Sequence, residues 1–245
     1  MNDTIALLKA HRSIRKFKPD EVPEEQLLEI IRSAQCAPTS SNMQAYSVIA
    51  VTDPDKKREL ARLAGDQPYI EQCPVFLVWC ADLHRLKYAC AQVEEVTVPA
   101  TTEIFIVATV DTALAAQNAA VAAESLGLGT VYIGGIRNNP REVSELLGLP
   151  DLVYPVFGMC LGYPDEAPTK RPRLPTRTVL HRNRYSADSF EDGIAEYNET
   201  LRHYMLTRAG SHKDSNWSKE MAARLRFSGR LHMKSFLSDR GFRLE

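Results

Sequence analysis

The chain has 245 residues, of which 44% are hydrophobic and 25% are charged. This length and composition are typical of an ordinary globular protein with a sizeable core. The formal net charge of −1 provides no overall field for nucleic acid or an anionic membrane, so we expect neither as a partner. The N-terminus lacks the apolar stretch of a secretion signal. Later apolar runs are broken by Gln, Asn and Glu and do not approach the ~20 residues of a membrane span. A cytoplasmic protein is predicted.

Five cysteines are spread along the chain, and no pair has CxxC spacing. An odd number without a secretion signal predicts reduced thiols. We interpret them, including Cys36, as packing residues, with a redox or nucleophilic cysteine as the alternative. The six histidines show no ligand spacing relative to the cysteines, so no metal site is expected.

The first part of the chain predicts alternating helices and strands. Asn2, Asp3 and Thr4 can cap a short helix that ends near Lys9. The elements expected after it are a basic loop at 11–23, a helix at 24–37, a polar turn at 38–44, a strand at 46–52, a helix at 54–65, a loop at 65–74 and a buried strand at 75–82.

A long stretch without Gly or Pro, residues 102–126, carries apolar or small side chains nearly all round. This pattern predicts a deeply buried helix, either in the core of one subunit or packed against its symmetry mate. The elements expected after it are a strand and glycine turn at 130–138, a short helix at 140–150, a strand at 153–164, a basic loop broken by prolines at 167–185, and two polar helices at about 188–206 and 214–240.

Strands and helices therefore mix without strict βαβ alternation, which indicates an α+β fold. No GxGxxG follows a strand, so a Rossmann dinucleotide domain is disfavoured. The polar segment from residue 188 onward is interpreted as a helical extension wrapped on the main domain or on a partner.

Three clusters combine positive charge or hydroxyl groups: residues 11–15, 39–44 and 170–175. A phosphate monoester needs several such donors at once, and two arginine-rich loops could converge on one. Each cluster alone is equally typical of a solvated loop. No GxSxG or HExxH occurs, which fits a protein whose cofactor supplies the chemistry.

Five blocks in order resemble the oxygen-insensitive NADPH nitroreductase and flavin reductase group of the nitroreductase superfamily. They are HRSIR at 11–15, PTSSNMQ at 38–44, GDQPY at 65–69, VYIGGIRN at 131–138 and RPRLP at 171–175, and DTALAAQN at 111–118 is also similar. The resemblance covers nearly the whole chain.

The resemblance implies a nitroreductase-like α+β fold with a central mixed β-sheet flanked by helices, in a homodimer with a swapped C-terminal arm. Residues 1–187 would form the FMN-binding core, and residues 188–245 the helical extension of the same structural unit. It also implies a ping-pong reaction, in which NADPH reduces bound FMN and leaves before nitroaromatics, quinones, flavins or similar acceptors take the electrons. The alternatives are an NADPH:flavin reductase that supplies reduced FMN to a partner enzyme, and a flavin-binding redox sensor.

Carried over residue by residue, the resemblance implies an FMN site drawn from both subunits. His11, Arg12 and Ser13 would bind the phosphate together with Arg171 and Arg173. Arg15 would lie near the pyrimidine edge and favour an anionic reduced flavin. The remaining implied contacts are Gln67 and Tyr69 at the ribityl chain or ring edge, Thr39, Ser40, Asn42 and Gln44 from the partner chain, and Ile133, Gly134 and Gly135 near the flavin N5.

Three assignments within this resemblance stay open. Glu103 matches a family glutamate near the flavin, or it is the exposed first turn of the long helix. Related sequences have LysProArg before LeuPro, whereas this chain has LysArgProArg, so either Lys170 or Arg171 would contact phosphate. Arg208, His212 and Lys213 would meet the 2′-phosphate of NADPH, or they form a solvated loop.

Overall fold

The computed structural model describes residues 2–94, 97–208, 212–227 and 229–244. The chain divides into two compact units, which comprise residues 1–167 with 230–245 and residues 168–229. The predicted boundary between the core and the helical extension, after residue 187, does not coincide with the boundaries of these units. That the core and the extension form one structural unit stays a prediction.

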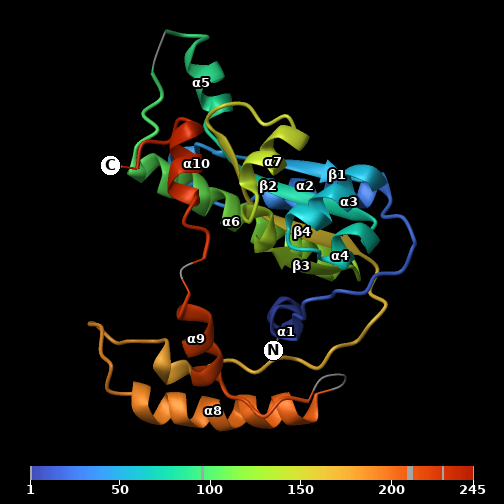
Figure 1. The fold of residues 1–245 in the computed structure, drawn as a ribbon, viewed down its shortest axis with the longest axis vertical. Helices are drawn as coiled ribbons and strands as arrows, with labels where there is room; N and C mark the ends of the chain where they lie inside the picture. Colours follow the sequence, from blue (N-terminus) through green and yellow to red (C-terminus); the bar gives the residue numbers. More distant parts are fainter. Residues whose placement is uncertain (1, 95–96, 209–211, 228, 245) are drawn as a thin grey trace. The chain divides into compact units, whose positions relative to one another are not determined.

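The first unit is built on a four-stranded sheet with the strand order β1-β2-β4-β3 (Figure 1). The strands are β1 (Tyr46–Val51), β2 (Val75–Asp82), β3 (Gly129–Ile133) and β4 (Val153–Gly162). All three neighbouring pairs are antiparallel. The expected mixed sheet is therefore wrong for these strands. The parallel pairing in the described chain is an isolated bridge between Ser13 and Thr130.

Helices accompany this sheet in the first unit, as expected for an α+β fold. They are α1 (Asp3–Ala10), α2 (Glu24–Gln35), α3 (Pro54–Leu63), α4 (Pro68–Gln72), α5 (His84–Cys90), α6 (Thr102–Ser125), α7 (Pro140–Leu146) and α10 (Met233–Asp239), with the short 3-10 turns η1 (Ser40–Asn42) and η2 (Gly134–Arg137). Capping defines two of the starts: Ile5 N donates to Asn2 Oδ1 over 3.0 Å, and Lys56 N donates to Asp53 Oδ1 over 2.8 Å.

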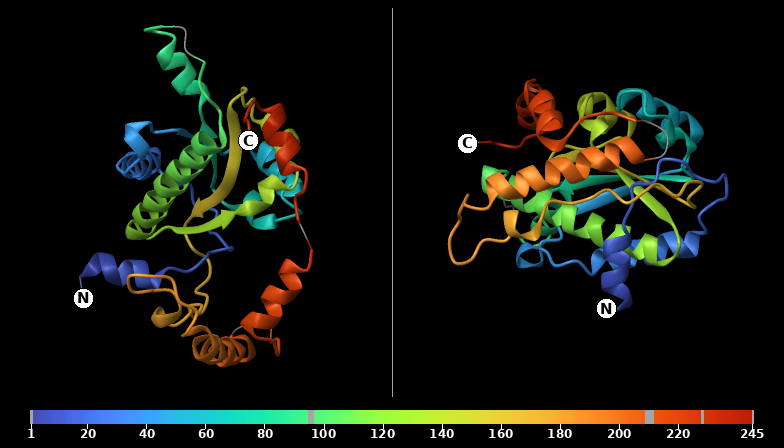
Figure 2. Two further views of the ribbon diagram at one scale, coloured as in Figure 1. Left: turned by 90° about the vertical axis from the view of Figure 1, so that its left-hand side faces the viewer. Right: turned by 90° about the horizontal axis from the view of Figure 1, so that it is seen from below.

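Strand β2 is buried along its whole length and separates two hydrophobic layers. The sheet has helices on both of its faces (Figure 2). Val75, Leu77 and Trp79 pack with residues of α2 and α6 on one face. Phe76, Val78 and Cys80 pack on the other face with α3, α4 and α7. Because alternate side chains of a strand point to opposite faces, one continuous apolar run can supply both layers.

Helix α6 buries a row of alanines against the sheet but leaves part of its apolar surface exposed. Ala115, Ala119 and Ala123 are fully buried. The prediction of a buried helix holds for this face within one subunit, whereas residues on the opposite face are exposed in the single chain: Ile106 47%, Val110 48% and Leu114 40%. The packing of α6 against its symmetry mate stays a prediction. The helix is also long and apolar enough to cross a membrane, contrary to expectation. Its packing against α2 and β2 is typical of a core helix.

Two further expectations are wrong. The loop predicted at 65–74 contains helix α4, which has Pro68 at its first position, where proline favours a helix start. The helix predicted over 214–240 is two helices, α9 (Trp217–Leu225) and α10. Between them Arg230 has a φ of 60°, a left-handed conformation that a helix cannot continue through.

The second unit consists mainly of α8 (Phe190–Thr207) and α9, with a 3-10 turn η3 (Thr176–Thr178). Tyr197, Leu201 and Met205 form the buried stripe of α8. The Tyr197 and Trp217 rings meet edge to face with their centroids 5.9 Å apart. This stripe gives the polar extension a small core of its own.

Candidate functional site

The first basic segment, residues 11–15, runs from the end of α1 beside β3. Ile14 is buried, and its N–H donates to Thr130 O over 3.0 Å. Gly129 permits this approach, because a Cβ there would lie 2.6 Å from Ile14 Cγ1. The segment is therefore held against the sheet by backbone pairing and one apolar anchor, and Arg12 and Arg15 remain exposed.

His11 and Arg12, two of the predicted phosphate contacts, line a small cavity of about 180 Å³. His11 Nδ1 lies 2.5 Å from Glu124 Oε1, near the end of α6. Sequence reasoning missed this carboxylate. The lining of this cavity therefore pairs a predicted phosphate contact with an acidic side chain.

Arg15, Gln67 and Tyr69 form a connected group, although they come from two segments far apart in the sequence. The Tyr69 hydroxyl donates to Gln67 Oε1, and Gln67 Nε2 donates to Ala64 O over 2.7 Å. Burial raises the pKa of Tyr69, and the nearby positive charge of the Arg15 guanidinium opposes that rise. Three predicted flavin contacts are thus brought together.

The glycine turn that follows β3 packs onto the same group. A Cβ on Gly135 would lie 2.3 Å from both Ala64 O and Gln67 Nε2. Gly135 therefore allows the turn to approach this part of its own chain. Ile133 is buried and Gly134 is half-buried beside Arg137.

The polar turn at 38–44 has an unusual backbone. Ser41, Asn42 and Gln44 have φ values of 48°, 57° and 50°. Residues other than glycine rarely adopt this left-handed conformation, which costs about 1–3 kcal/mol each and persists only where neighbouring structure holds it. Ser40, Asn42 and Gln44 are exposed and Thr39 is half-buried, so the turn presents several hydrogen-bonding groups.

Asp111 of α6 contacts this turn and was not among the predicted site residues. Its side chain is almost fully buried, and its carboxylate accepts hydrogen bonds from Ser40 N over 3.0 Å and Ala45 N over 3.2 Å. The sequence contained a signal for it, because Asp111 is a charged residue in the middle of a largely apolar helix.

Glu103, an alternative flavin contact, lies exposed in the first turn of α6. Cys36, interpreted from the sequence as a packing residue, is exposed at the end of α2, so that interpretation is wrong for the single chain. The flavin contact of Glu103 stays a prediction. The described residues contain no group of three or more His, Cys, Asp and Glu side chains that could hold a metal ion.

The third basic cluster lies in the second unit, where Lys170, Arg171 and Arg173 are exposed. Arg173 Nη1 donates to Arg171 O over 2.9 Å, and Tyr197 anchors the segment by donating to Pro172 O over 3.0 Å. The positive charge of Arg171 contributes to lowering the pKa of Glu220, after larger effects of Lys213 and Ser215. Whether Lys170 or Arg171 contacts phosphate stays a prediction.

The predicted NADPH residues lie between α8 and α9, and residues 209–211 of their loop are outside the described chain. Lys213 Nζ pairs with Glu220 Oε1 at 2.7 Å. His212 Nδ1 lies 2.5 Å from Leu206 O, and the Arg208 guanidinium carbon lies 6.0 Å from the centre of the Tyr204 ring. To bind the 2′-phosphate of NADPH, Lys213 would have to break its ion pair with Glu220.

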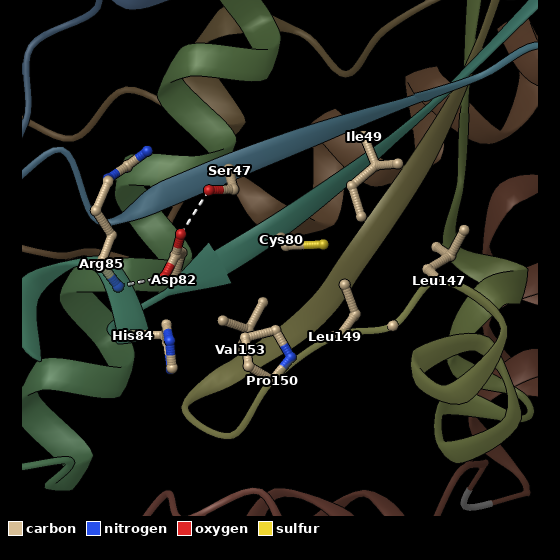
Figure 3. A pocket seen from close by; sticks show the side chains of 11 residues that line it. Ser47, Ile49, Cys80, Asp82, His84, Arg85, Leu147, Leu149, Pro150 and Val153 are labelled. Carbon is tan, nitrogen blue, oxygen red and sulfur yellow. Dashed lines mark hydrogen bonds between the residues drawn. The ribbon is translucent and has the colours of Figure 1, made fainter. Parts of the chain in front are cut away.

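Another cavity, of about 220 Å³, lies where β1 and β2 meet the segment after α7 (Figure 3). Ser47 Oγ donates to Asp82 Oδ2 over 2.5 Å, and burial raises the pKa of Cys80, which points into the cavity, to about 12. His84 also lines the cavity. The Ser47 hydroxyl donates directly to a carboxylate and not to an imidazole, so the arrangement is not that of an activated nucleophile.

Comparison with known proteins identifies the family of the chain. Residues 8–163 match the model of the nitroreductase family, and residues 171–245 match that of the nitroreductase family, C-terminal domain. The chain belongs to the nitroreductase family. Its relatives include an FMN reductase (NADPH) of Bacillus subtilis, 42% identical over 99% of both chains, and an oxygen-insensitive NADPH nitroreductase of Salmonella typhimurium, 40% identical over 99% of both.

Solved structures of the nitroreductase family resemble the chain along nearly its whole length. The NADPH:FMN oxidoreductase of Vibrio harveyi, complexed with NAD+, superposes with a TM-score of 0.88 and 40% identity, over 98% of each chain. The nitroreductase-like fold is thereby confirmed.

Proposed function

We propose that this nitroreductase-family protein is an FMN-dependent oxidoreductase that passes a hydride from NADPH through bound FMN to nitroaromatics, quinones, flavins or similar acceptors by a ping-pong mechanism. The observation that carries the proposal is the group formed by Arg15, Gln67 and Tyr69 at the glycine turn. Relatives that act as NADPH-dependent FMN reductases and nitroreductases support it.

The residues of this group fit a flavin. A flavin ring offers carbonyl and nitrogen acceptors along one edge, and Arg15 supplies a fixed positive charge beside them. The Tyr69 hydroxyl is hydrogen-bonded to the Gln67 side chain, so the positions of both side chains are fixed before a ligand binds. When bound, FMN supplies the hydride chemistry, and the protein supplies binding, orientation and electrostatics.

We further propose a homodimer with a swapped C-terminal arm, in which each FMN site draws residues from both subunits. The exposed apolar stripe of Ile106, Val110 and Leu114 on α6 supports an interface of this kind, because apolar surface of this extent on a helix is usually covered. His11, Arg12 and Ser13, with Arg171 and Arg173, would bind the phosphate, and Thr39, Ser40, Asn42 and Gln44 would come from the partner. We place this dimer in the cytoplasm.

The decisive measurement is the visible absorption spectrum of the purified protein before and after anaerobic NADPH. We expect flavin bands near 450 nm, a general flavin property, that bleach with NADPH and recover with a nitroaromatic or a quinone. A colourless protein that stays unreactive after FMN is added would overturn the cofactor, the site and the mechanism together.

The flavin-reductase alternative is tested on the same protein. If the protein supplies reduced FMN to a partner enzyme, its FMN exchanges readily with free flavin and free FMN is the best acceptor. Tightly held FMN with faster turnover of quinones or nitroaromatics favours the direct reductase.

A further inference from the structure

We propose that Asp111 is a positioning residue for the flavin site: from inside α6 it holds the strained turn at 41–44 in the shape that presents its side chains to the cofactor. This inference rests on the proposed function, because the role of the turn in FMN binding is part of that proposal. Asp111 itself is almost fully buried, so it acts through the turn and not by contact with flavin.

The turn needs an external restraint. Three of its residues, Ser41, Asn42 and Gln44, are left-handed without being glycine. Its side-chain hydrogen bonds are long, with Gln44 N to Thr39 Oγ1 at 3.4 Å and Gln44 Nε2 to Asn42 Oδ1 at 3.3 Å. One backbone bond within the turn, from Met43 N to Ser40 O, has an ordinary length of 2.9 Å, and that from Asn42 N to Thr39 O is 3.3 Å. These few bonds leave three left-handed residues in need of further support.

Asp111 supplies the restraint at both ends of the turn at once. One carboxylate oxygen accepts from Ser40 N and the other from Ala45 N, over 3.0 and 3.2 Å. These two amides flank the strained residues, and both bonds are made by one rigid, charged group on a 24-residue helix. Hydrogen bonds to an ionised acceptor are stronger than neutral ones, and a buried carboxylate depends on them.

Arg85 of α5 also binds the backbone of this segment. Its Nη2 donates to Gln44 O over 2.6 Å and to Tyr46 O over 2.5 Å. In Figure 3 its guanidinium points away from the cavity that its backbone lines. Asp111 therefore holds amide groups of the segment while Arg85 holds carbonyl groups, and the exposed side chains between them remain available to a ligand.

The test compares FMN affinity with protein stability in Asp111→Asn. Asparagine keeps the shape but has one acceptor oxygen, and its amino group would face the second backbone N–H. FMN is titrated onto flavin-free protein and followed by the quenching of flavin fluorescence. We expect the dissociation constant to rise by about ten- to hundred-fold. Ser144→Ala, which removes a buried hydroxyl on α7 far along the chain, is the control for general destabilisation.

A second variant identifies the cause. Ser41→Gly in the Asp111→Asn background removes the steric cost of one left-handed residue, and Ser41 is not among the predicted flavin contacts. We expect it to recover part of the lost affinity, which a merely structural role of Asp111 elsewhere in α6 would not produce. Equal FMN affinity of Asp111→Asn and the wild type would overturn the inference.

If Asp111→Asn does not fold, Arg85→Met carries the test. We expect a several-fold rise in the FMN dissociation constant, because two bonds to a charged donor are lost on the exposed side. An unchanged constant in that variant would then overturn the inference. A wild-type protein that binds no FMN would instead reject the proposed function, so the two failures are distinguishable.

Discussion

At the scale of single residues, the fixed position of Gln67 depends on a glycine 68 positions later in the chain. A Cβ on Gly135 would meet Ala64 O and Gln67 Nε2, each at 2.3 Å. The Ala64 carbonyl belongs to the backbone at the end of α3, so the backbone of the glycine turn or of this helix end must shift, and the amide of Gln67 must move as well. Its displacement would break its bond to Ala64 and remove the acceptor of Tyr69.

We therefore expect Gly135→Ala to lower the free energy of unfolding by about 1–3 kcal/mol through overpacking. It should also weaken FMN binding. Urea unfolding and FMN titration measure the two effects. Gly229→Ala is the matched control, since nothing lies within 4 Å of a Cβ at that position. If the FMN affinity of Gly135→Ala is unchanged, Gln67 does not contribute to FMN binding.

Substitution of the single residue Arg208 tests whether this loop makes the protein prefer NADPH to NADH. Its guanidinium lies over the Tyr204 ring at the end of α8, next to the loop of His212 and Lys213. If this loop binds the 2′-phosphate, Arg208→Ala should raise the Michaelis constant for NADPH by about tenfold or more and leave that for NADH nearly unchanged. Steady-state kinetics with both donors measures this. Equal effects on both would reject the assignment.

The buried thiol of Cys80 should make the free energy of unfolding depend on pH, in a direction that follows from its raised pKa. Burial first, and the nearby charge of Asp82 second, raise its pKa from 9.0 to about 12. Between these values the folded state keeps the thiol proton while the unfolded state loses it. The stabilisation is therefore fully present below pH 9 and is lost as the pH rises toward 12.

We expect the wild type to lose more free energy of unfolding than Cys80→Ala between pH 8 and pH 10.5, measured by urea unfolding. The exposed Cys36 should react with a thiol reagent in the native protein, whereas Cys80 should react only after denaturation. Parallel pH profiles for the two proteins would contradict the raised pKa.

At the scale of elements, sequence patterns predicted what local chemistry determines. Helix α1, helix α3 and strand β2 have clear signals in capping side chains or in a continuous apolar run, and all three form where expected. Helix α4 was missed because five residues are too few for a helical period. The break between α9 and α10 was missed because it depends on backbone conformation at Arg230 and not on hydrophobicity.

In the candidate site, too, the sequence predicted some residues and missed others. Family motifs predicted Arg15, Gln67 and Tyr69, which the fold brings together. They did not predict Asp111, Arg85 or Glu124, whose contacts join residues far apart in the sequence. The packing of α5 and α6 against the rest of the unit places these groups, so single-sequence patterns could at most mark Asp111 as an unusual charge in the middle of a largely apolar helix.

Helix α6 also carries a testable interface. Val110 lies between Ile106 and Leu114 at spacings of one helical turn, on the face that the single chain leaves exposed. We expect Val110→Glu to shift the protein from dimer to monomer in light scattering after size exclusion, because a carboxylate would be buried in an apolar contact. Lys56→Glu, at an exposed position of α3, is the control for added negative charge. A dimeric Val110→Glu protein would exclude this face from the interface.

At the scale of the whole molecule, a site shared between subunits links two equilibria that are otherwise independent. If residues of both chains bind each FMN, the cofactor stabilises the dimer and dimerisation creates the cofactor site. The melting temperature of the wild type should then rise with protein concentration and with added FMN, and FMN should have little effect on a monomeric variant. We expect monomeric Val110→Glu to bind FMN at least tenfold more weakly than the wild type, by fluorescence titration at micromolar concentration. A monomer that holds FMN with wild-type affinity would show that one chain completes the site, and residues 39–44 would then act within their own subunit.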